Sequence, residues 1–166
     1  MQDDLIDAIG WAAAQGIADP KRVCIAGASY GGYAAMRGAQ RDGDSYRCAI
    51  SYAGVSDLAA MMKYDRKFLL GDLSKGYWKE QANDFAAVSP RLHAAEFRVP
   101  MLIMHGAKDK RVPVKQSRAM ADELQRAGKK VDYVEQPLGD HHFSRTEDRL
   151  QFLEKTKAFL DRYNPS

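Results

Sequence analysis

The chain has 166 residues, 45% of them hydrophobic and 28% charged, which is typical of a single folded globular domain. The formal net charge is only +3, and basic residues are interspersed with acidic ones, which argues against a nucleic-acid-binding surface. No stretch is apolar for long enough to cross a bilayer, and the acidic opening MQDDLIDAIG is unlike a signal peptide. We therefore expect a cytoplasmic protein that binds neither nucleic acid nor membrane.

The first half of the chain alternates predicted helices and strands. Apolar residues at helical spacing predict a helix over 3–15, which ends at Gly16. A buried strand is predicted over 22–28, followed by a helix over 30–40 and a second apolar strand over 48–53. Continuous apolar strands joined by helices are typical of a parallel sheet covered by helices on both faces, so we predict an α/β fold.

The second half begins with a long excursion, residues 55–99, that has no clean hydrophobic period. Connections of this length often form lids or pocket walls, but its apolar residues fit equally well a cover over the sheet. Strands are predicted over 101–105 and 130–135, and helices over 114–127 and 145–163. In the 114–127 helix we expect Met120 and Leu124 to point inward. In the last helix we expect a buried stripe of Leu150, Leu153, Phe159 and Leu160.

The two cysteines, Cys24 and Cys48, both fall in predicted buried strands. Neither belongs to a C-x-x-C pair or to a cluster of possible metal ligands. We interpret them as free thiols that act as small core residues.

The segment GASYG combines a strand, a turn and a helix in the order that makes G-x-S-x-G a nucleophile elbow. Such a turn exposes Ser29 at the carboxyl end of the strand, over the N-terminus of the helix. Gly27 and Gly31 are expected to avoid Cβ clashes across the bend, and Gly32 to let the helix approach the strand. The backbone N–H of Tyr30 would point to where an oxyanion forms. The alternative is an ordinary Gly–Ser turn.

Further polar residues follow the third and fourth predicted strands. Asp109 comes after one of them, and His141 and His142 come after the other. Because the carboxyl ends of parallel strands meet at one sheet edge, we expect these side chains to meet Ser29 there, in the Ser–Asp–His order of α/β-hydrolases. An imidazole could then activate the hydroxyl, oriented by the carboxylate.

Which of the two adjacent histidines takes this role is left open by the spacing. We interpret His105, at a strand end, as structural. The chain has no H-E-x-x-H motif, and adjacent histidines tend to point apart, which argues against a metal site. We expect no metal or organic cofactor.

Three motifs, GASYGGYA, MHGAKDKRVP and GDHHFSR, resemble the catalytic domain of the prolyl oligopeptidase family of serine peptidases. The resemblance is strongest to its acylaminoacyl-peptidase and dipeptidyl-peptidase branches and covers nearly the whole chain. In the family pattern the catalytic histidine follows an acidic or small residue and stands two places before an apolar one. His141, between Asp140 and Phe143, fits this pattern. The resemblance therefore implies Ser29 as nucleophile, His141 as base and Asp109 as its orienting carboxylate.

The resemblance also implies a pocket for the residue that precedes the scissile bond. Val55 and Val112 match positions that line it. Leu58 and Met61 stand where the dipeptidyl-peptidase pattern has aromatic residues. We therefore expect an apolar pocket without a tight fit to proline.

The resemblance implies a family architecture in which a β-propeller precedes an eight-stranded α/β-hydrolase sheet. This chain matches only the last four strands of that sheet. We expect residues 1–166 to form one domain, the carboxyl-terminal part of the peptidase domain, without the propeller, the early strands or a second oxyanion donor. The open edge of strand 22–28 predicts pairing with a second copy or with a missing amino-terminal portion.

The expected activity is hydrolysis of peptides or N-blocked aminoacyl substrates through an acyl-enzyme on Ser29. The alternatives are an esterase for small acyl esters that uses the same three residues, and an inert fragment or assembly module.

Overall fold

The computed structural model describes residues 1–66 and 84–165, so residues 67–83 of the predicted excursion lie outside the described residues. In chain order the helices and strands are α1 (Gln2–Ala14), β1 (Cys24–Ala28), α2 (Tyr30–Arg41), β2 (Cys48–Tyr52), α3 (Leu58–Asp65), β3 (Met101–Gly106), α5 (Lys115–Arg126), β4 (Val131–Gln136) and α6 (Thr146–Tyr163), with 3-10 helices at Gly43–Ser45 and Pro90–Glu96. Within these described ranges, no helix has the length and apolar character of a membrane span.

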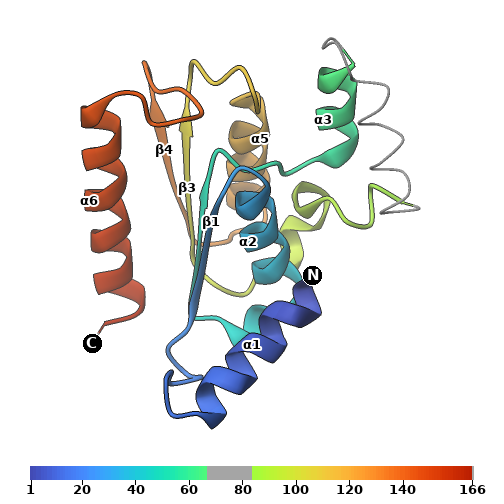
Figure 1. The fold of residues 1–166 in the computed structure, drawn as a ribbon. Helices are drawn as coiled ribbons and strands as arrows, with labels where there is room; N and C mark the ends of the chain where they lie inside the picture. The colour runs from blue at the N-terminus through green and yellow to red at the C-terminus, as the bar shows by residue number, and fades with distance from the viewer. Residues whose placement is uncertain (67–83, 166) are drawn as a thin grey trace.

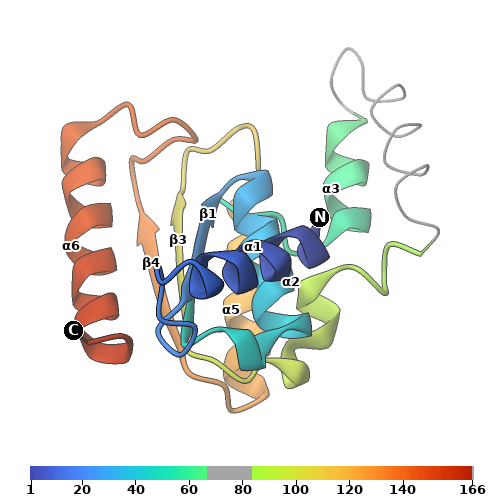
Figure 2. The ribbon, with the colours of Figure 1, turned by 60° about the horizontal axis from the view of Figure 1, so that its bottom comes forward.

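The four strands form one sheet in the order β1-β2-β3-β4, and each neighbouring pair is parallel. Helices α2 and α5 lie on one side of the sheet and α6 on the other (Figure 1, Figure 2). Because both faces are covered, every residue of β2 and β3 is buried. The predicted parallel sheet with helices on both faces is therefore confirmed.

Alternate residues of β3 supply two separate apolar clusters, one on each face of the sheet. Met101 and Ile103 pack with α2 and α5, where Met120 and Leu124 are fully buried as predicted. Leu102 and Met104 belong to the opposite cluster, with Phe159 of α6. The strand thus buries side chains in both directions, which explains its uninterrupted apolar sequence.

The predicted stripe of α6 is only partly correct. Phe159 is buried, and Leu160 packs against the same cluster, but Leu150 and Leu153 are 55% and 62% exposed. Phe152, Phe159 and Tyr163 recur at helical spacing on the face that packs on the sheet, and the two exposed leucines lie off that face. The sequence pattern of leucines therefore indicated the wrong rotation for the first half of this helix.

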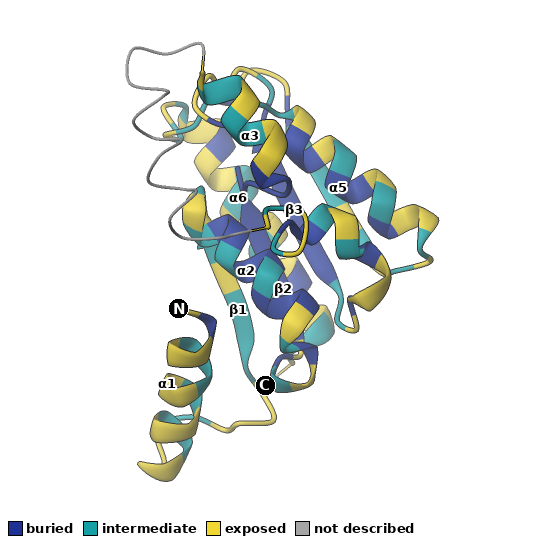
Figure 3. Ribbon diagram, turned by 90° about the vertical axis from the view of Figure 1, so that its right-hand side faces the viewer, coloured by how far each residue is buried: buried dark blue, intermediate teal, exposed yellow. Residues whose placement is uncertain are grey.

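The amino-terminal elements are largely exposed, and the first strand is less buried than predicted. Helix α1 stands away from the sheet, beyond β1, and most of it is exposed (Figure 3). It contacts α2 through Gln2, whose side-chain amide donates to the carbonyl of Ala34 at 3.0 Å. Strand β1 is half-buried to exposed rather than fully buried, because among the described strands only β2 pairs with it.

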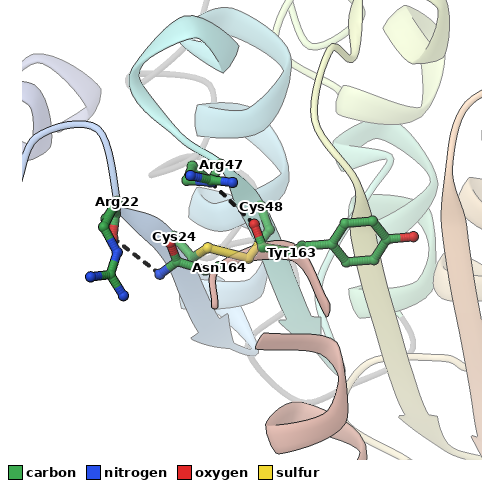
Figure 4. The surroundings of a disulfide bond; sticks show 6 residues. All are labelled: Arg22, Cys24, Arg47, Cys48, Tyr163 and Asn164. Atoms are coloured by element: carbon green, nitrogen blue, oxygen red, sulfur yellow. Dashed lines mark hydrogen bonds between the residues drawn. A yellow bond between two sulfur atoms is a disulfide. The ribbon is translucent and has the colours of Figure 1, made fainter. Parts of the chain in front are cut away.

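The expectation of free thiols is wrong, because Cys24 and Cys48 form a disulfide bond (Figure 4). The two cysteines are the first residues of β1 and β2, and the parallel register pairs them directly, with their Cα atoms 4.7 Å apart. This separation lies in the range that a disulfide requires. The sequence did not indicate this disulfide, because the two cysteines are 24 residues apart, on either side of a helix, and form no local motif.

The carboxyl-terminal end of α6 lies over this disulfide. The side-chain amide of Asn164 donates to the carbonyl of Arg22 at 3.1 Å, and the guanidinium of Arg47 donates to the carbonyl of Tyr163 at 3.2 Å (Figure 4). The amino ends of the first two strands and the end of the chain are thereby fastened together.

Candidate active site

Ser29 occupies the turn between β1 and α2 and has φ 56° and ψ −119°. Positive φ is rare for a residue with a side chain and is maintained only where the surroundings hold it. Here the backbone N–H of Ser29 donates to the carbonyl of Tyr52 at 2.9 Å, and its carbonyl accepts from the N–H of Tyr33 at 3.1 Å. The strand on one side and the helix on the other thus fix the serine at the apex of the bend.

Close backbone approach explains two of the three glycines at the elbow. A Cβ on Gly27 would overlap the backbone of Gly31, and one on Gly32 would lie 2.7 Å from the Cα of Gly54. The expectation for Gly31 is wrong, because a Cβ there would meet nothing within 4 Å. The bend therefore depends on Gly27, and the contact between α2 and the segment after β2 depends on Gly32.

His141 lies between Ser29 and Asp109. Its Nδ1 is 2.7 Å from Oδ2 of Asp109, and its Nε2 is 3.0 Å from Oγ of Ser29. A carboxylate only accepts, so the neutral imidazole donates Nδ1–H to Asp109 and accepts the serine O–H at Nε2. His142 is exposed, and its backbone N–H donates to the Asp140 side chain at 3.0 Å. The structure thus brings His141, and not His142, to the serine.

The carboxylate of Asp109 is fully buried and held from several sides. Its Oδ1 accepts the backbone N–H groups of Arg111 and Val112 at 2.8 and 2.9 Å. Burial acts to raise the pKa of Asp109, but the hydrogen bonds from His105 and His141 and from the Val112 N–H outweigh it, and the pKa lies below its ordinary value. The group is therefore a carboxylate at neutral pH, as an orienting anion must be.

The loop that carries His141 is held by residues that the sequence did not single out. The hydroxyl of Tyr52 donates to the carbonyl of Asp140 at 2.8 Å, and the ring of Tyr52 stacks on Phe143 with 3.8 Å between centroids. The Asp140 carboxylate accepts the N–H groups of His142 and Ser144, and the Ser144 bonds lower its pKa to about 2. A large aromatic residue with a hydroxyl at the end of a buried strand was the available signal for Tyr52.

The four residues predicted to form the substrate pocket lie together. Val55, Leu58 and Val112 are buried in one cluster with Tyr33, and Met61 packs against it. Tyr33 is one helical turn after Ser29, and the Val112 N–H is bound to Asp109, so the cluster adjoins the three polar residues. The opposite face of α3 borders a separate cavity of about 380 Å³. That cavity is lined by Asp57, Ala60, Lys63, Tyr64, Arg91, Pro113, Lys115, Gln116 and Ala119.

Tyr30, whose backbone N–H is the expected oxyanion donor, is the first residue of α2, directly after Ser29. Its ring lies 5.6 Å from that of Tyr33, centroid to centroid, and is half exposed. In the part of the chain that the structure describes, no group of three or more His, Cys, Asp or Glu side chains could hold a metal ion.

Known proteins resemble this chain over nearly its whole length. It is 33% identical over 170 residues to dipeptidyl aminopeptidase BIII of Pseudoxanthomonas mexicana, covering 96% of this chain and 24% of that protein. It is 26% identical over 169 residues to the acylamino-acid-releasing enzyme of Arabidopsis thaliana, covering 96% of this chain and 22% of that protein. The chain therefore spans about a quarter of the length of these curated relatives.

Solved structures give the same result for the fold. The puromycin-hydrolyzing peptidase of Mycobacterium tuberculosis superimposes with a TM-score of 0.87 at 27% identity, covering 98% of this chain and 25% of that one. The four strands and their helices therefore correspond to part of an α/β-hydrolase fold. Residues 1–165 match the prolyl oligopeptidase family. The chain belongs to the prolyl oligopeptidase family, whose members are serine peptidases.

Proposed function

We propose that this chain carries the reacting groups of a serine peptidase that hydrolyses peptides or N-blocked aminoacyl substrates through an acyl-enzyme on Ser29. The observation that supports it is the continuous series of hydrogen bonds from Ser29 through His141 to Asp109. In this reaction Oγ of Ser29 attacks the carbonyl carbon of the scissile bond while Nε2 of His141 takes the hydroxyl proton. The same nitrogen then returns the proton to the leaving amine.

Asp109 acts on the imidazole rather than on the substrate. Its hydrogen bond keeps the proton on Nδ1, so that Nε2 faces the serine as an acceptor. Its negative charge stabilises the imidazolium that forms when Ser29 loses its proton. The depressed pKa of Asp109 supports this role, because the group keeps its charge at neutral pH.

The backbone N–H of Tyr30 is the proposed donor to the oxyanion of the tetrahedral intermediate. The residue after the nucleophile supplies one such donor in an elbow of this kind. The neighbouring cluster of Val55, Leu58, Met61 and Val112 is the proposed wall of the pocket for the residue before the scissile bond. Its aliphatic character favours an apolar side chain without a fit specific for proline. No metal or organic cofactor enters these steps.

Labelling with a fluorophosphonate probe tests the proposal. We expect the chain to form one covalent adduct on Ser29, located by mass spectrometry after digestion. The Ser29→Ala variant should form none, and its turnover of aminoacyl anilides should fall by on the order of a million-fold. Ser45→Ala, in the 3-10 turn after α2, is the matched control and should label like the unchanged chain.

Two other outcomes have a defined meaning. Turnover of p-nitrophenyl acyl esters without turnover of aminoacyl anilides would contradict the peptidase and indicate an esterase with the same three residues. A folded chain that forms no adduct on Ser29 would contradict any hydrolase activity of this chain and favour an inert fragment or assembly module.

A further inference from the structure

We propose that His105 is a positioning residue that holds the Asp109 carboxylate toward His141, and this inference rests on the proposed function. His105 lies near the end of β3 and is 0% exposed. Its Nε2 is 2.9 Å from the carbonyl oxygen of Val112 and 3.2 Å from Oδ2 of Asp109. Its Nδ1 is 2.7 Å from Oγ of Ser117. The sequence had suggested only a structural histidine.

The partners of His105 determine its tautomer. A carbonyl and a carboxylate can only accept, so the proton of a neutral imidazole must be on Nε2. Nδ1 is then an acceptor and takes the O–H of Ser117, which is itself fully buried. With this assignment each polar atom of the histidine has a partner, as burial requires. Ser117 on α5 therefore fixes which nitrogen of His105 faces the carboxylate.

This arrangement extends the hydrogen-bonded series beyond the three predicted residues. The Ser117 hydroxyl donates to Nδ1 of His105, the Nε2–H of His105 is shared between the Val112 carbonyl and Oδ2 of Asp109, and Asp109 accepts the Nδ1–H of His141. Oδ2 of Asp109 therefore lies between two imidazole rings.

The carboxylate is thereby held at both of its oxygens. Two backbone N–H groups fix Oδ1, and the two imidazoles fix Oδ2. The N–H groups belong to Arg111 and Val112, two and three residues after Asp109, so they anchor Oδ1 to its own turn. His105 anchors Oδ2 to strand β3 instead. Without it, the hydrogen bond to His141 alone would set the direction of that oxygen.

The donor on His105 has two opposing effects on the reaction. It fixes the position of Oδ2, which favours the productive orientation of His141, and it withdraws some negative charge that would stabilise the imidazolium. A small misplacement in a catalytic constellation lowers the rate by about 100-fold. The secondary contact at 3.2 Å, shared with the Val112 carbonyl, withdraws little charge. Positioning therefore dominates, and loss of the donor should slow the reaction.

A matched pair of amide substitutions isolates this donor. In His105→Gln the amide nitrogen reaches about the position of Nε2 and can still donate to Asp109. In His105→Asn the shorter side chain reaches only the Ser117 side. Both variants are uncharged and polar, so they differ mainly in the donor that residue 105 directs to Asp109 and to the Val112 carbonyl. His105→Leu, similar in volume but unable to donate, replaces His105→Asn if that variant does not fold.

The first measurement is the rate of Ser29 labelling by the fluorophosphonate, together with kcat and KM for an aminoacyl anilide. We expect His105→Asn to lower the labelling rate and kcat by about 10- to 100-fold with KM unchanged, and His105→Gln to restore most of the loss. Equal rates in all three proteins, or a His105→Gln variant as slow as His105→Asn, would overturn the proposal.

The second measurement needs no turnover and therefore separates this proposal from the proposed function. The proton between His141 Nδ1 and Asp109 gives a far-downfield proton NMR signal when that hydrogen bond is well ordered. We expect this signal in the unchanged chain and in His105→Gln, and its loss or broadening in His105→Asn. A chain that fails to label but shows this pattern would contradict the peptidase and retain the positioning role. An unaltered signal in His105→Asn would overturn that role.

Discussion

At the scale of single residues, one buried hydroxyl fixes the loop that presents His141. Tyr52 ends β2, and its O–H donates to the carbonyl of the residue directly before His141. Burial, followed by the nearby carboxylates of Asp109, Asp140 and Asp148, raises the pKa of Tyr52 well above its ordinary value. The phenol therefore stays protonated and remains a donor. The position of the imidazole depends on β2 as well as on its own loop.

We predict that Tyr52→Phe weakens both stability and reactivity. The substitution removes the donor and leaves the Asp140 carbonyl without its partner, which should lower the free energy of unfolding by about 1 to 2 kcal/mol. Because the His141 loop loses its anchor, labelling of Ser29 should also become slower. Urea unfolding and the rate of fluorophosphonate labelling measure the two effects.

Tyr46→Phe is the matched control for this prediction. The Tyr46 hydroxyl is also buried, but it has no hydrogen-bond partner among residues 1–66 and 84–165. Its removal should leave the stability unchanged or raise it, because a buried polar group without a partner is unfavourable. If both phenylalanine variants lost equal stability, the hydroxyl of Tyr52 would have no special role in holding the loop.

At the scale of elements, the elbow depends on how closely the end of β1 approaches the first turn of α2. This approach leaves no room for a side chain at Gly27, whereas Gly31 faces open space. The two glycines of the G-x-S-x-G motif therefore have different physical roles. The first permits the bend, and the second lies within a helix, where glycine is normally unfavourable.

We predict opposite effects on stability for Gly27→Ala and Gly31→Ala. The first forces a Cβ into the Gly31 backbone, which cannot yield as a flexible side chain can, so unfolding should become easier by about 1 to 3 kcal/mol or more. The second adds a helix-favouring residue in open space and should stabilise by up to about 1 kcal/mol. Midpoints of urea unfolding test both, and a destabilised Gly31→Ala variant would contradict the assigned roles.

Local patterns predicted most elements of the fold, and non-local register explains what they missed. Apolar runs located the four strands to within two residues, and their order indicated that Ser29, Asp109 and either His141 or His142 would meet at one edge. The family resemblance, and not the spacing, selected His141. The disulfide and the contact of His105 with Asp109 depend on strand register and loop shape. The exposed face of α6 depends on how the helix is rotated on the sheet. The strand register and the helix rotation are not encoded in a short segment, and the contact between His105 and Asp109, only four residues apart, depends on the loop conformation.

At the scale of the whole molecule, the sheet has one edge at β1 that no other described strand covers. Unpaired strand edges readily pair with other chains. Pairing of this edge with a second copy, or with a further part of a longer sheet, stays a prediction. The carboxyl end of β1 leads into Ser29. A segment that pairs with the edge of β1 would therefore also border the proposed nucleophile.

The disulfide fastens this edge strand at the end far from Ser29. It links the first residues of β1 and β2 and closes a loop across 24 positions of sequence that contains the elbow and all of α2. Closing a loop of this length restricts the unfolded chain and typically stabilises a domain by about 2 to 4 kcal/mol. The redox state of the cysteine pair should therefore affect the stability of the fold more strongly than it affects the geometry of Ser29.

We predict that reduction lowers the unfolding midpoint but leaves Ser29 labelling nearly unchanged in the folded protein. The reduced and oxidised forms of the same chain differ only in the S–S bond, and a Cys24→Ala/Cys48→Ala variant, which should not respond to reductant, is the control. Mass spectrometry after alkylation gives the state of the pair. Full alkylation of both thiols without reductant would contradict the disulfide.

The cytoplasmic location stays a prediction, and the state of the cysteine pair tests it. Disulfides persist mainly in oxidising compartments, so a cytoplasmic location would favour the reduced pair. Alkylation inside intact cells measures which form is present.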